Sequence, residues 1–119
     1  MANFQATTVT EQSATVKNKK TALEYINNYF IDGGDDTMST EIDENNQLHV
    51  YGYGWFAAYN LDEDGEPIWD EDVSESFFEG LKNHIDDLLV IIMVGAEKCR
   101  YASACKIEVT PEKVEYTNL

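Results

Sequence analysis

The sequence predicts one α+β domain over residues 1–119, with two helices packed on a mostly antiparallel sheet. A chain of 119 residues suits one domain and is short for two of ordinary size. Two segments repeat apolar residues at helical spacing, and several segments of strand length are rich in aromatic and β-branched residues. No internal repeat or linker interrupts the chain, and 43% of its residues are hydrophobic, which is enough for a core.

The N-terminal part predicts a strand followed by a helix. Residues Phe4 to Val16 are rich in Thr, Val and Ala, which favours a strand. Asn18 is a suitable N-cap for a helix from about Lys19 to Phe30, whose apolar residues recur at i, i+3, i+4 and i+7. The Gly33-Gly34 pair predicts the end of that helix.

The middle of the chain predicts strands joined by turns. Polar and apolar residues alternate weakly from Met38 to Asp43, which favours a strand. The polar residues Glu44 to Gln47 favour a turn. The aromatic stretch Leu48 to Tyr59 predicts one long strand, whose two glycines permit a bulge. Asp62 to Gly65 predicts a hairpin turn, because Asp-Gly tolerates positive φ, and Glu66 to Trp69 predicts a short return strand.

The C-terminal part predicts a second helix and three strands. Asp72 to Glu75 matches a capping box for a helix that runs to about Ile85. The apolar face of that helix consists of Phe77, Phe78, Leu81 and Ile85. The apolar run Leu88 to Val94 predicts a central buried strand. Strands are also predicted at Tyr101 to Val109 and at Val114 to Tyr116, with a turn at Thr110 to Lys113 between them.

Charge is distributed unevenly along the chain. There are 23 acidic and 8 basic residues, a net charge of −15, yet no Lys or Arg lies between Thr21 and Leu81. That half also contains 11 of the 14 aromatic residues, so we expect it to be folded. A folded segment whose charges all have the same sign is destabilised by their repulsion. Solubility alone needs a net charge of only about 2 to 8. The excess therefore suggests a function that uses negative charge.

Composition argues against several functions. A nucleic-acid binder needs Lys and Arg to neutralise phosphates, and an anionic membrane repels this chain. The longest apolar run is seven residues, and the N-terminus is polar, so we expect neither a membrane span nor a secretory signal. We accordingly expect a cytoplasmic protein whose Cys99 and Cys105 are reduced core residues, although a turn between them would let them face each other.

Motifs for catalysis are weak or missing, so we expect no enzymatic activity, cofactor or metal. His49 and His84 are isolated in the sequence, and Arg100 is the only arginine. Residues Asn60 to Glu71 match an EF-hand calcium loop at five positions. An aromatic strand precedes them where a helix is required, and Pro67 occupies the eighth position. We therefore expect an acidic hairpin turn there, and little stabilisation by calcium.

Carboxylates on a folded scaffold can imitate the phosphates of nucleic acid. Residues i and i+2 of a strand lie about 6.6 Å apart, close to two nucleotide steps of about 3.4 Å. The hypothesis is a non-enzymatic mimic that inhibits a basic nucleic-acid-binding protein through one contiguous acidic face. The candidate partner-binding residues are Asp35, Asp36, Glu41, Asp43, Glu44, Asp62, Glu63, Asp64, Glu66, Asp70, Glu71, Asp72, Glu75 and Glu79.

In size, acidity and lack of catalytic motifs, the chain resembles phage- or mobile-element-encoded inhibitors of CRISPR or restriction systems. The resemblance covers size and composition and transfers no residue. An alternative is an accessory or structural module that binds a basic protein or a divalent cation. For either function we expect a monomer or a homodimer. Adaptation to high salt is a third interpretation, but it predicts acids spread over the whole chain, whereas the outer segments together carry +1.

Overall fold

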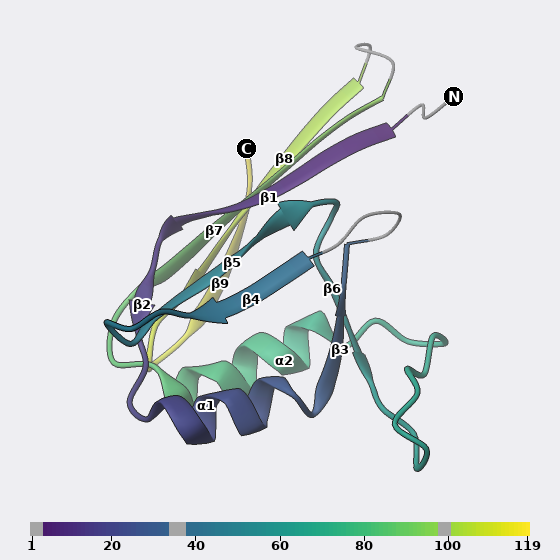
Figure 1. The fold of residues 1–119 in the computed structure, drawn as a ribbon. Helices are drawn as coiled ribbons and strands as arrows, with labels where there is room; N and C mark the ends of the chain where they lie inside the picture. The colour runs from purple at the N-terminus through teal and green to yellow at the C-terminus, as the bar shows by residue number, and fades with distance from the viewer. Residues whose placement is uncertain (1–3, 34–37, 98–100) are drawn as a thin grey trace.

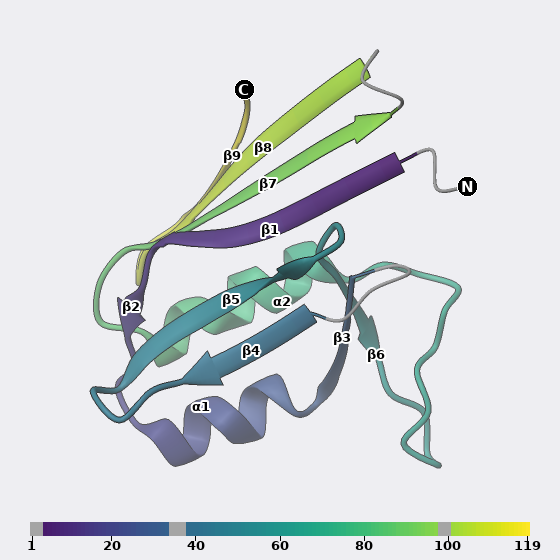
Figure 2. The same cartoon turned by 45° about the horizontal axis from the view of Figure 1, so that its top comes forward.

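The computed structural model describes residues 4–33, 38–97 and 101–119. Within them, an antiparallel sheet covers one side of the molecule and two helices lie beneath it (Figures 1 and 2), which confirms the predicted fold class. The sheet consists of β1 (Phe4–Gln12), β2 (Ala14–Thr15), β4 (Met38–Ile42), β5 (Gln47–Tyr53), β7 (Leu89–Glu97), β8 (Tyr101–Val109) and β9 (Val114–Asn118). Its order is β4-β5-β1-β7-β8-β9, with β2 also beside β5.

The apolar run around residue 90 forms the middle of the sheet, as predicted. β7 lies between β1 and β8, with Val9 opposite Ile92 and Ile91 opposite Ile107. Leu89 and Ile91 are fully buried on the side that faces the helices. The predicted C-terminal strands are also present, as β8 and β9.

The N-terminal strand bends where its pairing changes. The pairing of β1 with β7 shifts its register between Thr10 and Gln12, at the end of β1, and the short β2 begins at Ala14. β5 pairs with β1 at one end and with β2 at the other, which leaves a gap between them. The Thr10 hydroxyl fills this gap: it donates to the carbonyl oxygen of Val50 and accepts from the amide of Val50, both at 2.7 Å. A side chain thus replaces the missing backbone pair and satisfies both polar groups of Val50.

The first helix, α1 (Lys19–Ile26), is shorter than predicted. The Asn18 side chain accepts a hydrogen bond from the Thr21 amide at 3.0 Å, which confirms the expected cap. The predicted extension to Phe30 is wrong, because the helix ends at Ile26 and the chain then forms β3 (Tyr29–Asp32). The aromatic and β-branched residues of that segment favour a strand when a partner strand is available.

The partner strand of β3 lies in a segment where the sequence-based prediction is also corrected. The expected strand from Leu48 to Tyr59 is broken at Gly54, and its end forms β6 (Ala57–Asn60), which pairs with β3 in a separate two-stranded sheet. Gly54 has φ +124°, and a Cβ there would overlap the carbonyl oxygen of Gly33 and lie 2.6 Å from its carbon. Glycine therefore permits both the change of direction and the close passage of two backbones.

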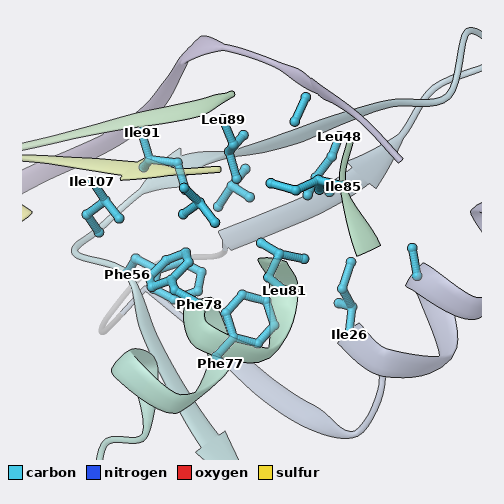
Figure 3. Packing of buried hydrophobic residues seen from close by; sticks show 14 of the residues in the cluster. Ile26, Leu48, Phe56, Phe77, Phe78, Leu81, Ile85, Leu89, Ile91 and Ile107 are labelled. Atoms are coloured by element: carbon cyan, nitrogen blue, oxygen red, sulfur yellow. The ribbon is translucent and has the colours of Figure 1, made fainter. Parts of the chain in front are cut away.

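The second helix, α2 (Ser74–Leu81), continues into a 3₁₀ turn, η1 (Lys82–His84). Its predicted apolar face is confirmed: Phe77, Phe78, Leu81 and Ile85 point between helix and sheet (Figure 3) and are at most 1% exposed. Together with residues of β5, β7 and β8 they form the core.

A tyrosine from α1 crosses α2 at its glycine. The Tyr25 hydroxyl donates a 2.7 Å hydrogen bond to the carbonyl oxygen of Phe77, and its ring stacks on Phe77 and His84. A Cβ at Gly80 would lie 2.7 Å from Cζ of Tyr25. Burial, followed by interaction with Tyr29, raises the pKa of Tyr25. Gly80 thus lets the two helices approach each other.

The segment after β6 contains the predicted turn but not the predicted return strand. Gly65 has φ +81°, and its amide donates to the carbonyl oxygen of Asp62 at 3.0 Å. Beyond the turn, only Leu61 and Pro67 form an isolated bridge. The bridge needs no amide hydrogen from Pro67, because the hydrogen bonds on either side of it run from the Asp62 amide to Glu66 and from the Ile68 amide to Asn60.

Candidate partner-binding surface

Three aromatic rings, the aromatic cluster (Phe30, Tyr59 and Trp69), are partly open to solvent. Phe30 and Tyr59 are paired across β3 and β6. The Trp69 ring meets both edge-on, with centroids 5.4 Å from Phe30 and 4.9 Å from Tyr59. Trp69 is 57% and Phe30 is 38% exposed. Exposed tryptophan and tyrosine side chains are frequent anchors of protein interfaces.

Trp69 belongs to the acidic loop, residues Asp62–Asp72, which projects beyond β6 at the right of Figure 1. The loop contains seven carboxylates and no Lys or Arg, and all seven acidic residues are exposed. Among the described residues, none of the seven forms an ion pair. Negative charge in the loop is therefore available to an external cation.

Hydrogen bonds fix both ends of the acidic loop to β6. The Ile68 amide donates to the carbonyl oxygen of Asn60 at 2.8 Å, and the Val73 amide donates to that of Ala58 at 2.7 Å. The Ser74 hydroxyl also accepts from the Ala58 amide at 3.1 Å. A loop fixed in this way loses less entropy when a partner binds it.

Two of the loop carboxylates have structural roles. Oδ1 of Asp62 accepts from the amides of Asp64 and Glu66, each at 2.9 Å. Oδ1 of Asp72 accepts from the Ser74 amide at 2.8 Å and from the Ser74 hydroxyl. Asp72 thus caps the start of α2 through Ser74 and does not reach Glu75 as the predicted capping box requires. The side chains of the other five loop acids accept no hydrogen bond within the described structure. These five are Glu63, Asp64, Glu66, Asp70 and Glu71.

A second acidic group lies at the turn between β4 and β5. Oδ1 of Asp43 accepts from the amides of Asn45 and Gln47, and its other oxygen lies 3.0 Å from Nε2 of His49. The Gln47 amide, followed by His49, lowers the pKa of Asp43. Glu41 accepts a 2.8 Å hydrogen bond from Tyr51, which raises the pKa of that tyrosine. These two carboxylates shape the hairpin.

Two further candidates line one side of α2. Glu79 forms an ion pair with Lys82 at 2.8 Å, while Glu75 lies in the first turn of the helix, where a negative charge is favourable. Burial and the nearby negative charges of Glu75 and Glu79 raise the pKa of Tyr116 to about 12.

The candidate acids that the structure describes lie on several elements, namely the acidic loop, β4 with the turn that follows it, and α2, and the single contiguous face stays a prediction. The acidic loop lies at one end of the molecule, and the turn that contains Glu44 lies at the opposite end (Figures 1 and 2). The aromatic cluster is beside the acidic loop, and the negative charges of Asp72 and Asp32 help to raise the pKa of Tyr59 after the effect of burial. Asp35 and Asp36 lie outside the described residues.

Other chemically active side chains are dispersed. His49 lies on β5 and His84 in η1, and Cys105 packs against the core from β8, while Cys99 lies outside the described residues. In the described part of the chain, no three His, Cys, Asp or Glu side chains are close enough to hold a metal ion. At the EF-hand match, the Asp62 carboxylate binds its own turn, and strand β6 occupies the position of the required helix.

Sequence reasoning missed the aromatic cluster. It assigned Phe30 to a helix and Trp69 to a return strand, so nothing brought the two together. The run Tyr29 to Asp32 before the glycines is the signal that could have indicated β3.

Comparison of the chain with family models, curated proteins and solved structures finds no match. No helix in the described ranges is long and apolar enough to cross a membrane.

Proposed function

We propose that this protein binds a basic protein whose own ligand is nucleic acid, and that it inhibits that protein by placing the acidic loop where phosphates would lie. One observation carries the proposal: the exposed Trp69 lies in a loop with seven exposed carboxylates, none of which forms an ion pair within the described structure. The two features supply the usual parts of an interface, an aromatic anchor and a charged rim.

Charge and aromatic surface have different roles in this proposal. Carboxylates of one sign steer a basic partner and speed association, but exposed charge pairs add little affinity individually. The aromatic cluster supplies apolar area that is removed from water on binding, at about 25 cal/mol per Å² before the cost of association. Binding should therefore depend on Trp69 for much of its affinity, and on the acids for the choice of partner and, through their combined charge, for a further part of the affinity.

Imitation of phosphates rests on charge density, because the acidic loop has no continuous strand to provide a regular repeat. The resemblance in size and acidity to inhibitors of CRISPR and restriction systems makes a nuclease of such a system the first partner to test. In this proposal the protein performs no chemistry, and the partner's basic groove is blocked.

The proposal can be tested by competition. The protein is immobilised and exposed to the heparin-binding fraction of a bacterial lysate, and each retained nuclease is then purified and measured by itself. Variant E63Q/D64N/E66Q/D70N removes four loop charges and keeps the two structural carboxylates. The control E11Q/E24Q/D86N/E112Q removes four exposed charges outside the loop.

The proposal predicts that nucleic acid displaces the partner, that the loop variant binds at least tenfold more weakly, and that the control binds like the parent. Binding should also weaken as salt rises, since surface charges are screened over about 8 Å at physiological ionic strength. Equal affinity of loop variant and parent, or a complex that saturating nucleic acid leaves intact, would contradict it. If the loop variant loses binding but nucleic acid does not displace the partner, the result favours the alternative, an accessory module that binds a basic protein.

A further inference from the structure

A pocket of about 410 Å³ lies between the start of α2 and the lower face of the sheet. Part of its lining is apolar and consists of buried residues, all at most 5% exposed: Phe56, Phe78, Met93 and Ile107. The half-buried Trp55 and the more open Tyr116 line it as well. A volume of this size is within the range of pockets that hold small molecules or single side chains.

Three acidic residues, Glu71, Asp72 and Glu75, line the same pocket. The pKa of Tyr116 is raised first by burial and then by the negative charges of Glu75 and Glu79. Among the described residues, no Lys or Arg lines the pocket. The pocket therefore combines negative charge with aromatic and apolar side chains.

This combination selects the chemistry of a ligand. An anion would meet three carboxylates, and the amide of Ser74 near the start of α2 is already occupied by Asp72. A neutral apolar group would leave the carboxylates without partners. A cation on an alkyl stem satisfies both parts, because its stem packs on apolar surface and its charge meets carboxylates and ring faces. Planar guanidinium groups stack on aromatic rings and bind carboxylates in pairs, so arginine fits better than lysine.

We infer that this pocket binds an arginine side chain of the protein partner, with its stem against Trp55 and its guanidinium between Glu71 and Glu75. The inference rests on the proposed function for the source of the arginine, since a nucleic-acid-binding surface is rich in this residue. The pocket is a second contact beside the aromatic cluster, and the Asp70–Val73 segment connects the two.

The test uses the full chain without any partner. N-acetyl-arginine amide is titrated into labelled protein, and NMR follows the Trp55 indole N–H and the Met93 methyl group. N-acetyl-citrulline amide has nearly the same shape without the charge and serves as the matched neutral probe. E71Q/E75Q removes two carboxylates of the pocket, and E63Q/D64N removes the same charge elsewhere in the acidic loop.

We expect the arginine probe to shift both reporter signals, with at least tenfold weaker binding for the citrulline probe and for E71Q/E75Q, and parental binding for E63Q/D64N. Equal binding of the two probes to the parent overturns the inference even if E71Q/E75Q fails to fold. Shifts confined to Trp69 overturn it too, because they place the cation on the aromatic cluster. If these outcomes occur while the four-charge loop variant still loses its partner, the proposed function stands and only the arginine pocket is wrong.

Discussion

Gly54→Ala should be among the most damaging single substitutions in this chain. The new Cβ would overlap the Gly33 carbonyl oxygen and lie 2.8 Å from Gly33 Cα, so two backbones have to separate. Residue 54 also has φ +124°, where any side chain is strained by about 1 to 3 kcal/mol. Overpacking adds about 1 to 3 kcal/mol. Moving the two backbones apart also weakens the 2.8 Å hydrogen bond that the Gly54 amide donates to the carbonyl oxygen of Ala6. We expect a loss of about 3 to 5 kcal/mol.

Gly65→Ala is the matched control for this experiment. Residue 65 has φ +81°, but a Cβ there would have no atom within 4 Å, so only backbone strain remains. We expect a loss of about 1 kcal/mol for this variant. Urea denaturation followed by tryptophan fluorescence gives both free energies of unfolding. The reasoning is refuted if the Gly54 variant is no less stable than the Gly65 variant, because the close backbone passage would then cost nothing.

Three further changes test other parts of the structure. Thr8→Val keeps the shape of a fully buried side chain but removes its 2.9 Å hydrogen bond to the Gly54 carbonyl oxygen, so urea denaturation should show a loss of about 1 to 2 kcal/mol. Gly80→Ala should cost about 1 to 3 kcal/mol despite the better helix propensity of alanine, and less in a Tyr25→Leu background, because the clash is with that ring. The pKa of Asp43 is lowered below its ordinary value of 3.8, so its stabilisation is present above pH 4 and lost as pH falls through the folded-state pKa. Asp43→Asn should therefore unfold more readily at pH 7 and lose less stability on acidification; equal acid sensitivity would contradict this.

Local sequence patterns predicted the elements that have a clear capping residue or a clear apolar spacing. Asn18 marked the start of α1, and the apolar spacing of Phe77 and Leu81 gave the buried face of α2. The errors occurred where tertiary contacts decided between two local preferences. Phe30 continues a helical pattern, but pairing with Tyr59 holds it in a strand, and only the passage beside Gly33 explains why the chain turns at Gly54.

Prediction of the candidate site was limited for the same reason. The sequence located the excess charge, yet it could not separate carboxylates that form local hydrogen bonds from those that face solvent. Asp62 and Asp72 bind nearby backbone amides, whereas Asp70 does not within the described structure. The aromatic cluster depends on the pairing of β3 with β6, a contact between residues about thirty positions apart, which no local pattern contains.

The order of strands in the sheet has a consequence during synthesis. β1 pairs along its length with β7, with Val9 opposite Ile92, so β1 is synthesised 83 residues (92 − 9) before its partner. At about 5 to 20 residues per second, β1 leaves the ribosome roughly 4 to 16 seconds before its partner. Closure of so long a segment also slows folding, as in other sheets with distant pairings. β1 contains Thr7, Thr8 and Thr10, and polar residues in a strand lower its tendency to associate while it is unpaired.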